Sequence, residues 1–175
     1  YGLSGIPIFQ ISRCAAKALY YHKNAVVHLD LIPQMDQKEL HGFLTKRMEQ
    51  RQMLTMSKFL IGIFNQKLIP CILRYAGIRE QTKVSELSET SFSALLHACK
   101  NMEFVITDTN GFEHAQVCAG GIRFDEVSHD TMESLCCKNL YLAGELLDVD
   151  GICGGYNLQW AWSSGYLAGL LKSGT

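Results

Sequence analysis

The 175-residue sequence lacks a charge excess and a long apolar run, and it contains only three prolines. Sixteen Lys and Arg side chains stand against seventeen Asp and Glu side chains, so the net charge is −1 and no basic surface for nucleic acid is predicted. The longest apolar segment, residues 160–171, is much shorter than the roughly 20 residues that cross a bilayer. We therefore expect a folded protein with neither nucleic-acid nor membrane partners.

Cysteine is present in an odd number, seven, but without a Cys-x-x-Cys pair. A structural zinc site is therefore not expected, and a chain of this length does not need disulfide bonds to fold. The thiols are interpreted as small buried apolar groups in a reducing compartment. These points favour a cytoplasmic protein without a bound metal ion.

Glycine is concentrated near the end of the sequence, where ten of its fifteen residues lie between Gly111 and Gly174. The chain opens on Tyr1-Gly-Leu-Ser-Gly5, without a methionine. We interpret this opening as the middle of a turn and expect the chain to be a piece of a longer protein.

Helical signals dominate the first hundred residues. Apolar spacing predicts a helix over residues 6–21, and a β-branched run ending before Pro33 predicts a strand over residues 25–32. Residues 34–101 are predicted to form a compact helical unit. Its helices are expected to begin at a capping box of Asp36 and Glu39, at Ser57, at Pro70 and at Ser88.

Strand signals begin after residue 101. Residues 103–118 contain two strand-like runs around Asn110-Gly111, which predicts a hairpin. Further strands are predicted over residues 122–127 and over Leu140–Ala143. Gly154-Gly155 then opens a final apolar helix, and we expect most of its circumference to be buried.

One segment has the sequence of elements that is typical of a ligand-binding site. Gly144-Glu145 follows the predicted strand, an acidic loop through Asp148 and Asp150 comes next, and Gly154-Gly155 precedes the helix. The end of the strand would supply an acceptor, and the first turn of the helix would supply N–H groups without an intrahelical partner. The same pattern also fits a plain strand–loop–helix unit in which glycine only permits tight turns. The pattern alone leaves both interpretations open.

These residues resemble a known family. The stretches Ala115-Gln-Val-Cys-Ala-Gly-Gly-Ile122, Thr131-Met-Glu-Ser134 and 140–165 closely resemble the C-terminal signature of bacterial NAD(P)/FAD-dependent oxidoreductases. This family has aminoacetone-oxidase-like and bile-acid-reductase-like (BaiN-type) members. Tyr1–Gly5 and Gln10-Ile-Ser12 are similar to the family's Gly-Leu-Ser-Gly-Pro…Gln-x-Ser segment, although Ile6 stands where proline is usual.

The resemblance implies an α+β fold in four parts. Residues 1–33 would belong to a β-barrel-like insertion and residues 34–101 to a small helical insertion subdomain. Residues 102–119 would be returning strands of the insertion, and residues 120–175 the C-terminal strand–loop–helix of a Rossmann-like FAD domain. The family's N-terminal glycine-rich Rossmann unit is absent from this sequence, and in the parent protein it would be the missing partner.

The resemblance also implies a cofactor site. In the parent protein FAD would carry hydride to or from a small organic substrate, with NAD(P)H as a further partner. The implied FAD-binding residues are Gly144, Glu145, Gly154, Gly155, Tyr156, Asn157 and Leu158. We expect the chain alone to bind FAD weakly or not at all and to be inactive, and no catalytic residue is assigned. The alternative hypothesis is a self-standing helical interaction module without a cofactor.

Overall fold

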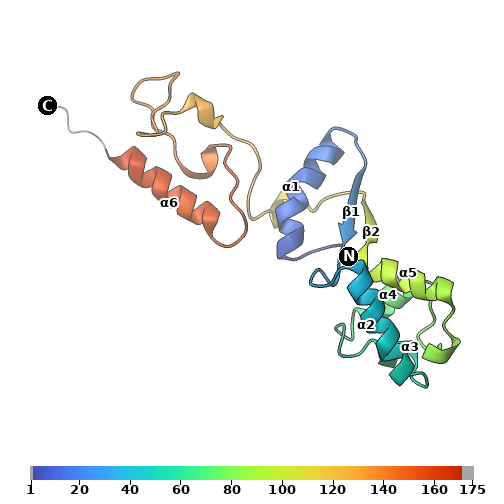
Figure 1. The fold of residues 1–175 in the computed structure, drawn as a ribbon. Coiled ribbons are helices and arrows are strands. Elements are labelled where there is room, and N and C mark those ends of the chain that lie inside the picture. Colours follow the sequence, from blue (N-terminus) through green and yellow to red (C-terminus); the bar gives the residue numbers. More distant parts are fainter. Residues whose placement is uncertain (1, 171–175) are drawn as a thin grey trace. The chain divides into compact units, whose positions relative to one another are not determined.

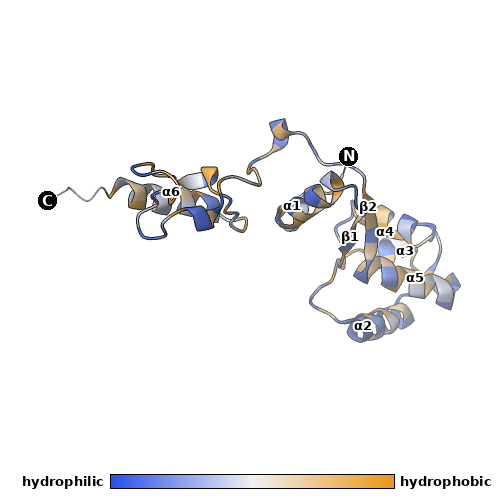
Figure 2. Ribbon diagram, turned by 90° about the horizontal axis from the view of Figure 1, so that it is seen from above, coloured by the Kyte–Doolittle hydropathy of each residue, from blue (hydrophilic) through white to orange (hydrophobic). Residues whose placement is uncertain are grey.

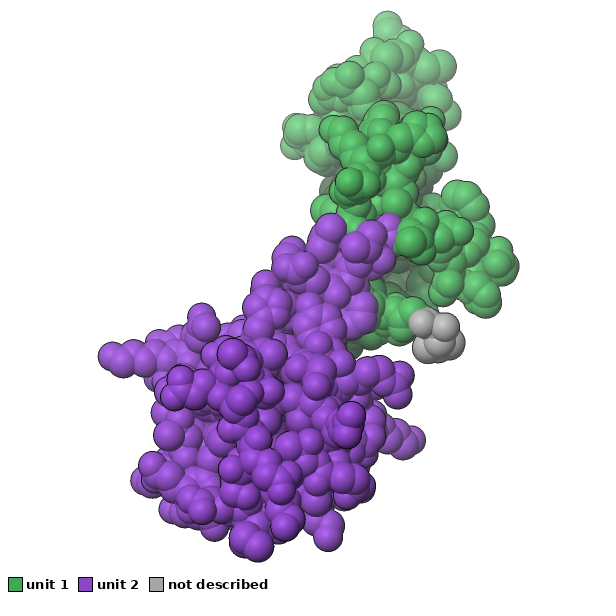
Figure 3. Space-filling model, turned by 90° about the vertical axis from the view of Figure 1, so that its right-hand side faces the viewer, with its two compact units in different colours: residues 1–25, 107–175 green, residues 26–106 purple. Residues whose placement is uncertain are grey.

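The computed structural model describes residues 2–170 and separates into two compact units (Figure 3). Unit 1 consists of residues 1–25 and 107–175, and unit 2 consists of residues 26–106. The described residues form six α-helices and one two-stranded antiparallel sheet, and none of these helices is long and apolar enough to span a membrane.

Unit 2 is a helical unit flanked by the two strands of the sheet. Its elements are β1 (Ala25–Leu29), α2 (Gln37–Gln50), α3 (Met56–Phe59), α4 (Ile69–Tyr75), α5 (Glu89–Lys100) and β2 (Met102–Ile106). The strands pair with each other, so the four helices lie in the connection between two neighbouring strands (Figure 1).

The starts of three helices follow the sequence signals. Asp36 caps α2, its carboxylate accepting the Glu39 N–H at 2.8 Å, while the Glu39 carboxylate accepts the Asp36 N–H at 2.8 Å. The Ser88 hydroxyl caps α5, and Pro70 lies in the first turn of α4. The prediction at Ser57 was wrong: α3 begins after Thr55 and ends at Phe59, because the chain turns at Gly62 with φ +86°.

The core of unit 2 lies between α2, α3, α4 and α5. Its members are apolar side chains that are fully or nearly fully buried: Leu40, Leu44, Met56, Phe59, Leu60, Ile69, Ile72, Leu73, Ile78, Val84, Leu95, Leu96, Ala98, Cys99 and Met102. Figure 2 shows hydrophilic residues along α2, whose Leu40 and Leu44 face the core. Burial of this apolar surface is the main stabilising contribution to the unit.

Lys100 joins the end of α5 to the segment between β1 and α2. Its ammonium donates to the Asp30 carboxylate at 2.6 Å and to the carbonyl oxygens of Ile32 and Met35 at 3.1 and 2.6 Å. Burial alone would raise the pKa of Asp30, but the hydrogen bonds from Lys100 and the Ile32 N–H, with the ammonium charge, outweigh it and lower that pKa. The ionised carboxylate is therefore the form that the fold favours.

Most of the cysteines are exposed, so the interpretation of the thiols as buried apolar groups was wrong for all but one of them. Only Cys99 is buried, and burial raises the pKa of its thiol to about 12. The other six are exposed and free: Cys14, Cys71, Cys118, Cys136, Cys137 and Cys153. Their positions in loops and on outer helix faces explain the difference, because neither place offers a core to enter.

Unit 1 contains α1 (Ile6–Tyr20), α6 (Tyr156–Gly169) and short 3₁₀ turns in the chain between Phe112 and Leu146. A second, smaller core is formed by Val127, Met132, Leu142 and Leu147, with the partly buried Trp160 packed against it. The backbones of Ile122 and Leu147 are paired in parallel, and Glu133 is paired with Tyr141 in antiparallel fashion.

The strand predictions of this unit were largely wrong. No hairpin forms at Asn110-Gly111, because β2 pairs with β1 and residues 112–114 form a 3₁₀ turn instead. The segments 122–127 and Leu140–Ala143 make only isolated bridges. A strand requires a neighbouring strand to accept its hydrogen bonds, and residues 2–170 supply none here; for the same reason they form no barrel.

Helix α6 was expected to be buried around most of its circumference, and this was wrong. Ser164 is its only buried residue, while Leu158, Trp162 and Tyr166 lie along one exposed face, with Trp162 68% exposed. The spacing of these three residues, four apart, places them on the same side of the helix. Trp160 packs against the small core of the unit, whereas Trp162 does not.

Replacement of Lys100 by methionine is expected to lower the free energy of unfolding by about 2 kcal/mol at neutral pH, because two carbonyls and a carboxylate lose their donor. The Asp30 pKa is lowered in the folded chain, so its contribution is present above the ordinary carboxyl pKa near 4 and is lost as the pH falls through the lower folded value. Urea unfolding between pH 2 and 7 should therefore show a flatter acid limb for Lys100→Met. The control Lys46→Met, at an exposed position of α2, should follow the unmodified chain; equal acid limbs in all three proteins would contradict this assignment.

Gly121→Ala is expected to destabilise unit 1 more than Gly120→Ala. Both glycines have positive φ, which costs an alanine about 1–2 kcal/mol. At Gly121 an added Cβ would also lie 2.6 Å from the Leu146 carbonyl oxygen and 3.0 Å from the Asp148 nitrogen, whereas at Gly120 it would meet nothing within 4 Å. Thermal unfolding followed by tryptophan fluorescence should show the larger loss for Gly121→Ala, and equal losses would argue against the close backbone contact.

Candidate functional site

The start of α6 is an exposed helix N-terminus formed by two glycines. Gly154 and Gly155 have φ +128° and +92°, and Gly155 is the N-cap residue. No side chain among the described residues accepts a hydrogen bond at this cap, and a Cβ added to Gly155 would meet nothing within 4 Å. The first-turn N–H groups therefore have no side-chain acceptor among the described residues, and the helix dipole favours negative charge beside them.

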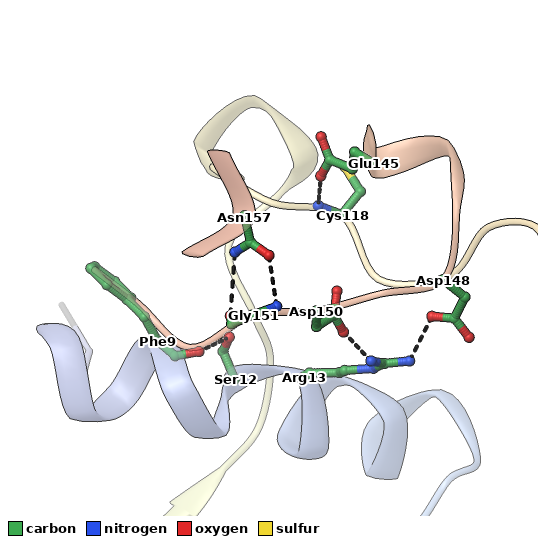
Figure 4. A network of polar contacts seen from close by, with 9 residues as sticks. All are labelled: Phe9, Ser12, Arg13, Cys118, Glu145, Asp148, Asp150, Gly151 and Asn157. Atoms are coloured by element: carbon green, nitrogen blue, oxygen red, sulfur yellow. Dashed lines mark hydrogen bonds and ion pairs between the residues drawn. The ribbon is translucent and has the colours of Figure 1, made fainter. Parts of the chain in front are cut away.

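The loop before this helix is fastened to the first turn. The Asn157 side-chain oxygen accepts the Gly151 N–H at 2.7 Å, and its amide nitrogen donates to the Gly151 carbonyl at 3.3 Å (Figure 4). A Cβ on Gly151 would lie only 2.9 Å from the Cβ of Tyr156. The sequence did not assign this role to Asn157: it holds the loop in place through its side chain.

Gly144 is fixed against the middle of the same helix. Its N–H donates to the Ser164 hydroxyl at 2.9 Å, and its carbonyl accepts the Trp160 indole N–H at 3.1 Å. Because Gly144 has φ +68°, the chain can turn here, two residues after the buried Leu142. This pair of hydrogen bonds links the predicted strand end to α6, although the strand itself is only a bridge.

Glu145 points away from these contacts, toward another segment. Its carboxylate accepts the Cys118 N–H at 2.7 Å, which brings residues 118 and 145 together (Figure 4). The side chain is exposed, so it remains accessible to a ligand. A carboxylate can accept several hydrogen bonds at once, and its bond to Cys118 therefore does not use up its capacity.

Tyr156 and Leu158 add an exposed apolar surface to the helix start. Tyr156 is 56% and Leu158 60% exposed. Free N–H groups next to aromatic and aliphatic side chains suit a flat, partly apolar ring with an anionic edge. The isoalloxazine ring of FAD has this character, so the residues present fit that group.

Arg13 is a residue of this region that sequence reasoning missed. Its guanidinium contacts the carboxylates of both Asp148 and Asp150, with an N–O distance of 2.9 Å to Asp148. More than 130 residues separate the partners in sequence, so no local pattern could have indicated the contact. The ion pairs hold Asp148 and Asp150 of the acidic loop that precedes α6. In the described part of the chain, no cluster of three His, Cys, Asp or Glu side chains is placed to hold a metal ion.

The sequence is similar to those of known proteins. Residues 45–171 match the family model described as the HI0933-like protein Rossmann domain. The 3-dehydro-bile acid delta(4,6)-reductase of Clostridium scindens is 51% identical over 97% of the chain and 41% of its own length. The ribosomal RNA dihydrouridine synthases of Haemophilus influenzae and Escherichia coli are 33% and 30% identical, over 97% and 94% of the chain and 40% and 39% of their own lengths.

The chain spans about two fifths of the length of the curated relatives that it matches. Two of those relatives are named for ribosomal RNA, a substrate class that the balanced charge of this chain does not predict. The family model covers most of the chain, and the first relative is identical at half of the aligned positions. The chain therefore belongs to the HI0933-like family of FAD oxidoreductases.

Proposed function

We propose that this chain supplies the C-terminal part of the FAD site, together with an insertion, in a flavin-dependent oxidoreductase. Residues 120–175 would belong to the FAD domain, residues 34–101 to a helical insertion, and residues 1–33 and 102–119 to its β-rich parts. The match to a Rossmann-domain family model supports this proposal over the alternative of a self-standing helical interaction module.

The observation that carries the proposal is the uncapped N-terminus of α6 behind Gly154 and Gly155. Its free N–H groups would hold the anionic edge of the flavin ring, and Tyr156 and Leu158 would lie against its apolar part. Asn157 would hold the Gly151 loop in a fixed position against the first turn. Gly144 and Glu145 would lie toward the ribityl and phosphate portion, and the bound flavin would supply the redox chemistry.

The exposed face of α6 supports a further part of the proposal. Trp162 and Tyr166 are both more than two-thirds exposed, which is unusual for large aromatic side chains on one helix face. The relatives carry about three fifths of their length outside the matched region. We expect an equivalent nucleotide-binding unit, with its own glycine-rich loop, to cover this face and to hold the remainder of FAD.

The names of the relatives indicate a general type of reaction for the whole protein and not a particular substrate. One is named as a bile-acid reductase and two as dihydrouridine synthases, so reduction of an organic substrate, with NAD(P)H as the source of electrons, is the activity that we propose for the whole protein. The insertion would contribute to substrate binding, and no residue of the described chain is assigned as a catalytic acid or base.

The full-length protein, with any residues that flank these 175, is expected to purify yellow with about one FAD per chain. Gly155→Trp should reduce the bound FAD at least tenfold, because its side chain would occupy the space in front of the first-turn N–H groups. The matched control is Gly62→Trp: Gly62 also has positive φ, +86°, and open surroundings, but lies in unit 2. Absorbance at 450 nm against protein concentration gives the ratio. A colourless full-length protein that takes up no added FAD would falsify the proposed function.

The 175-residue chain alone should bind FAD with a dissociation constant weaker than micromolar, because it carries only one of the two parts that contact the cofactor. Titration of FAD fluorescence with the chain, with Gly155→Trp as the reference for unspecific binding, measures this. Micromolar or tighter binding that Gly155→Trp abolishes would show that the 175-residue chain forms a sufficient site by itself.

A further inference from the structure

Two negative charges lie in the loop that leads to the proposed flavin site. Asp148 and Asp150 belong to the segment between Leu147 and α6, and Gly151, the next residue, lies against the first turn of the helix. Negative charge at this place opposes an anionic ligand edge, whereas the helix N-terminus favours it. The two carboxylates would therefore weaken the site if they were left uncompensated.

Arg13 of α1 compensates them. One guanidinium nitrogen contacts Asp148 and the other contacts Asp150, so a single planar fork holds both carboxylates (Figure 4). The three groups together carry one net negative charge instead of two. The side chains are 44%, 35% and 25% exposed for Arg13, Asp148 and Asp150, so water screens their charges only in part.

The path of the loop does not depend on Arg13 alone. The Ile122 carbonyl accepts the Asp148 N–H at 2.9 Å, and the Ile122 N–H donates to the Leu146 carbonyl at 2.9 Å. Asn157 holds Gly151 on the other side of the two acidic residues. Since hydrogen bonds that do not involve Arg13 fix both ends of the acidic segment, the specific contribution of Arg13 is the placement and neutralisation of the two carboxylates.

We propose that Arg13 is a positioning residue of the FAD site, which holds and neutralises Asp148 and Asp150 so that the N-terminus of α6 keeps its preference for an anionic ligand edge. The inference rests on the proposed function of that helix start. It assigns to α1, a helix distant in sequence, an electrostatic role in cofactor affinity and in the reduction potential of the bound flavin.

The first test is the FAD affinity of the full-length protein and of its Arg13→Gln variant. The dissociation constant should rise about three- to tenfold at low salt, the effect of two partly exposed ion pairs, and the difference should shrink as ionic strength increases. Lys17→Gln is the matched control, because it removes a positive charge from the same helix at an exposed position where the described residues offer no ion pair. Its affinity should stay within about twofold of the unmodified protein.

The second test separates charge compensation from a merely structural link. The triple variant Arg13→Gln, Asp148→Asn, Asp150→Asn lacks the ion pairs but also lacks the uncompensated charges, so its FAD affinity should return to within about twofold of the original. The flavin midpoint potential should become more negative in Arg13→Gln and recover in the triple variant. Unchanged affinity in Arg13→Gln, or a triple variant as weak as the single one, would overturn the proposal. A full-length protein without FAD would instead overturn the proposed function and the inference with it.

Discussion

The close approach of two main chains, at Ile122 and at Leu146–Asp148, is the constraint on which unit 1 depends. This approach exists because Gly121 has no Cβ: an added one would overlap the Leu146 carbonyl. The contact places Leu147 in the small core and sends Asp148 and Asp150 outward to Arg13. From there the loop runs to Gly151, and the Asn157 amide fixes it at the start of α6. The proposed site is thus built from backbone groups whose positions are set by contacts between short segments.

The two units are stabilised in different ways. Unit 2 encloses a core of fifteen buried residues within four helices, and its ends are fastened by the Asp36 capping box and by Lys100. Among the described residues of unit 1, the core has four buried members, while the apolar helix α6 leaves Trp162 and Tyr166 exposed. A helix of this composition gains most of its stability from packing, so its exposed face is consistent with a partner that the relatives' additional length would supply.

Sequence signals were reliable where the determining interaction is local. The capping box at Asp36, the cap at Ser88, the proline at the start of α4 and the glycine at the start of α6 all involve groups within four residues of each other, and all are present. The hairpin at Asn110-Gly111 and the strand over Leu140–Ala143 were wrong because a strand depends on a neighbour that no local pattern specifies. Asn110-Gly111 can form a tight turn, but the strand before it, β2, pairs with β1 and not with residues 112–118.

The sequence by itself determined where α2, α4, α5 and α6 begin, the order of glycines and acids between residues 144 and 155, and the family to which those residues belong. Only the tertiary structure decided that Asn157 holds Gly151, that Glu145 turns to the Cys118 N–H, and that Arg13 joins Asp148 and Asp150. The physical reason is the range of the forces involved. Capping and backbone conformation act within one turn of chain, whereas an ion pair across more than 130 residues exists only after packing has brought two distant segments together.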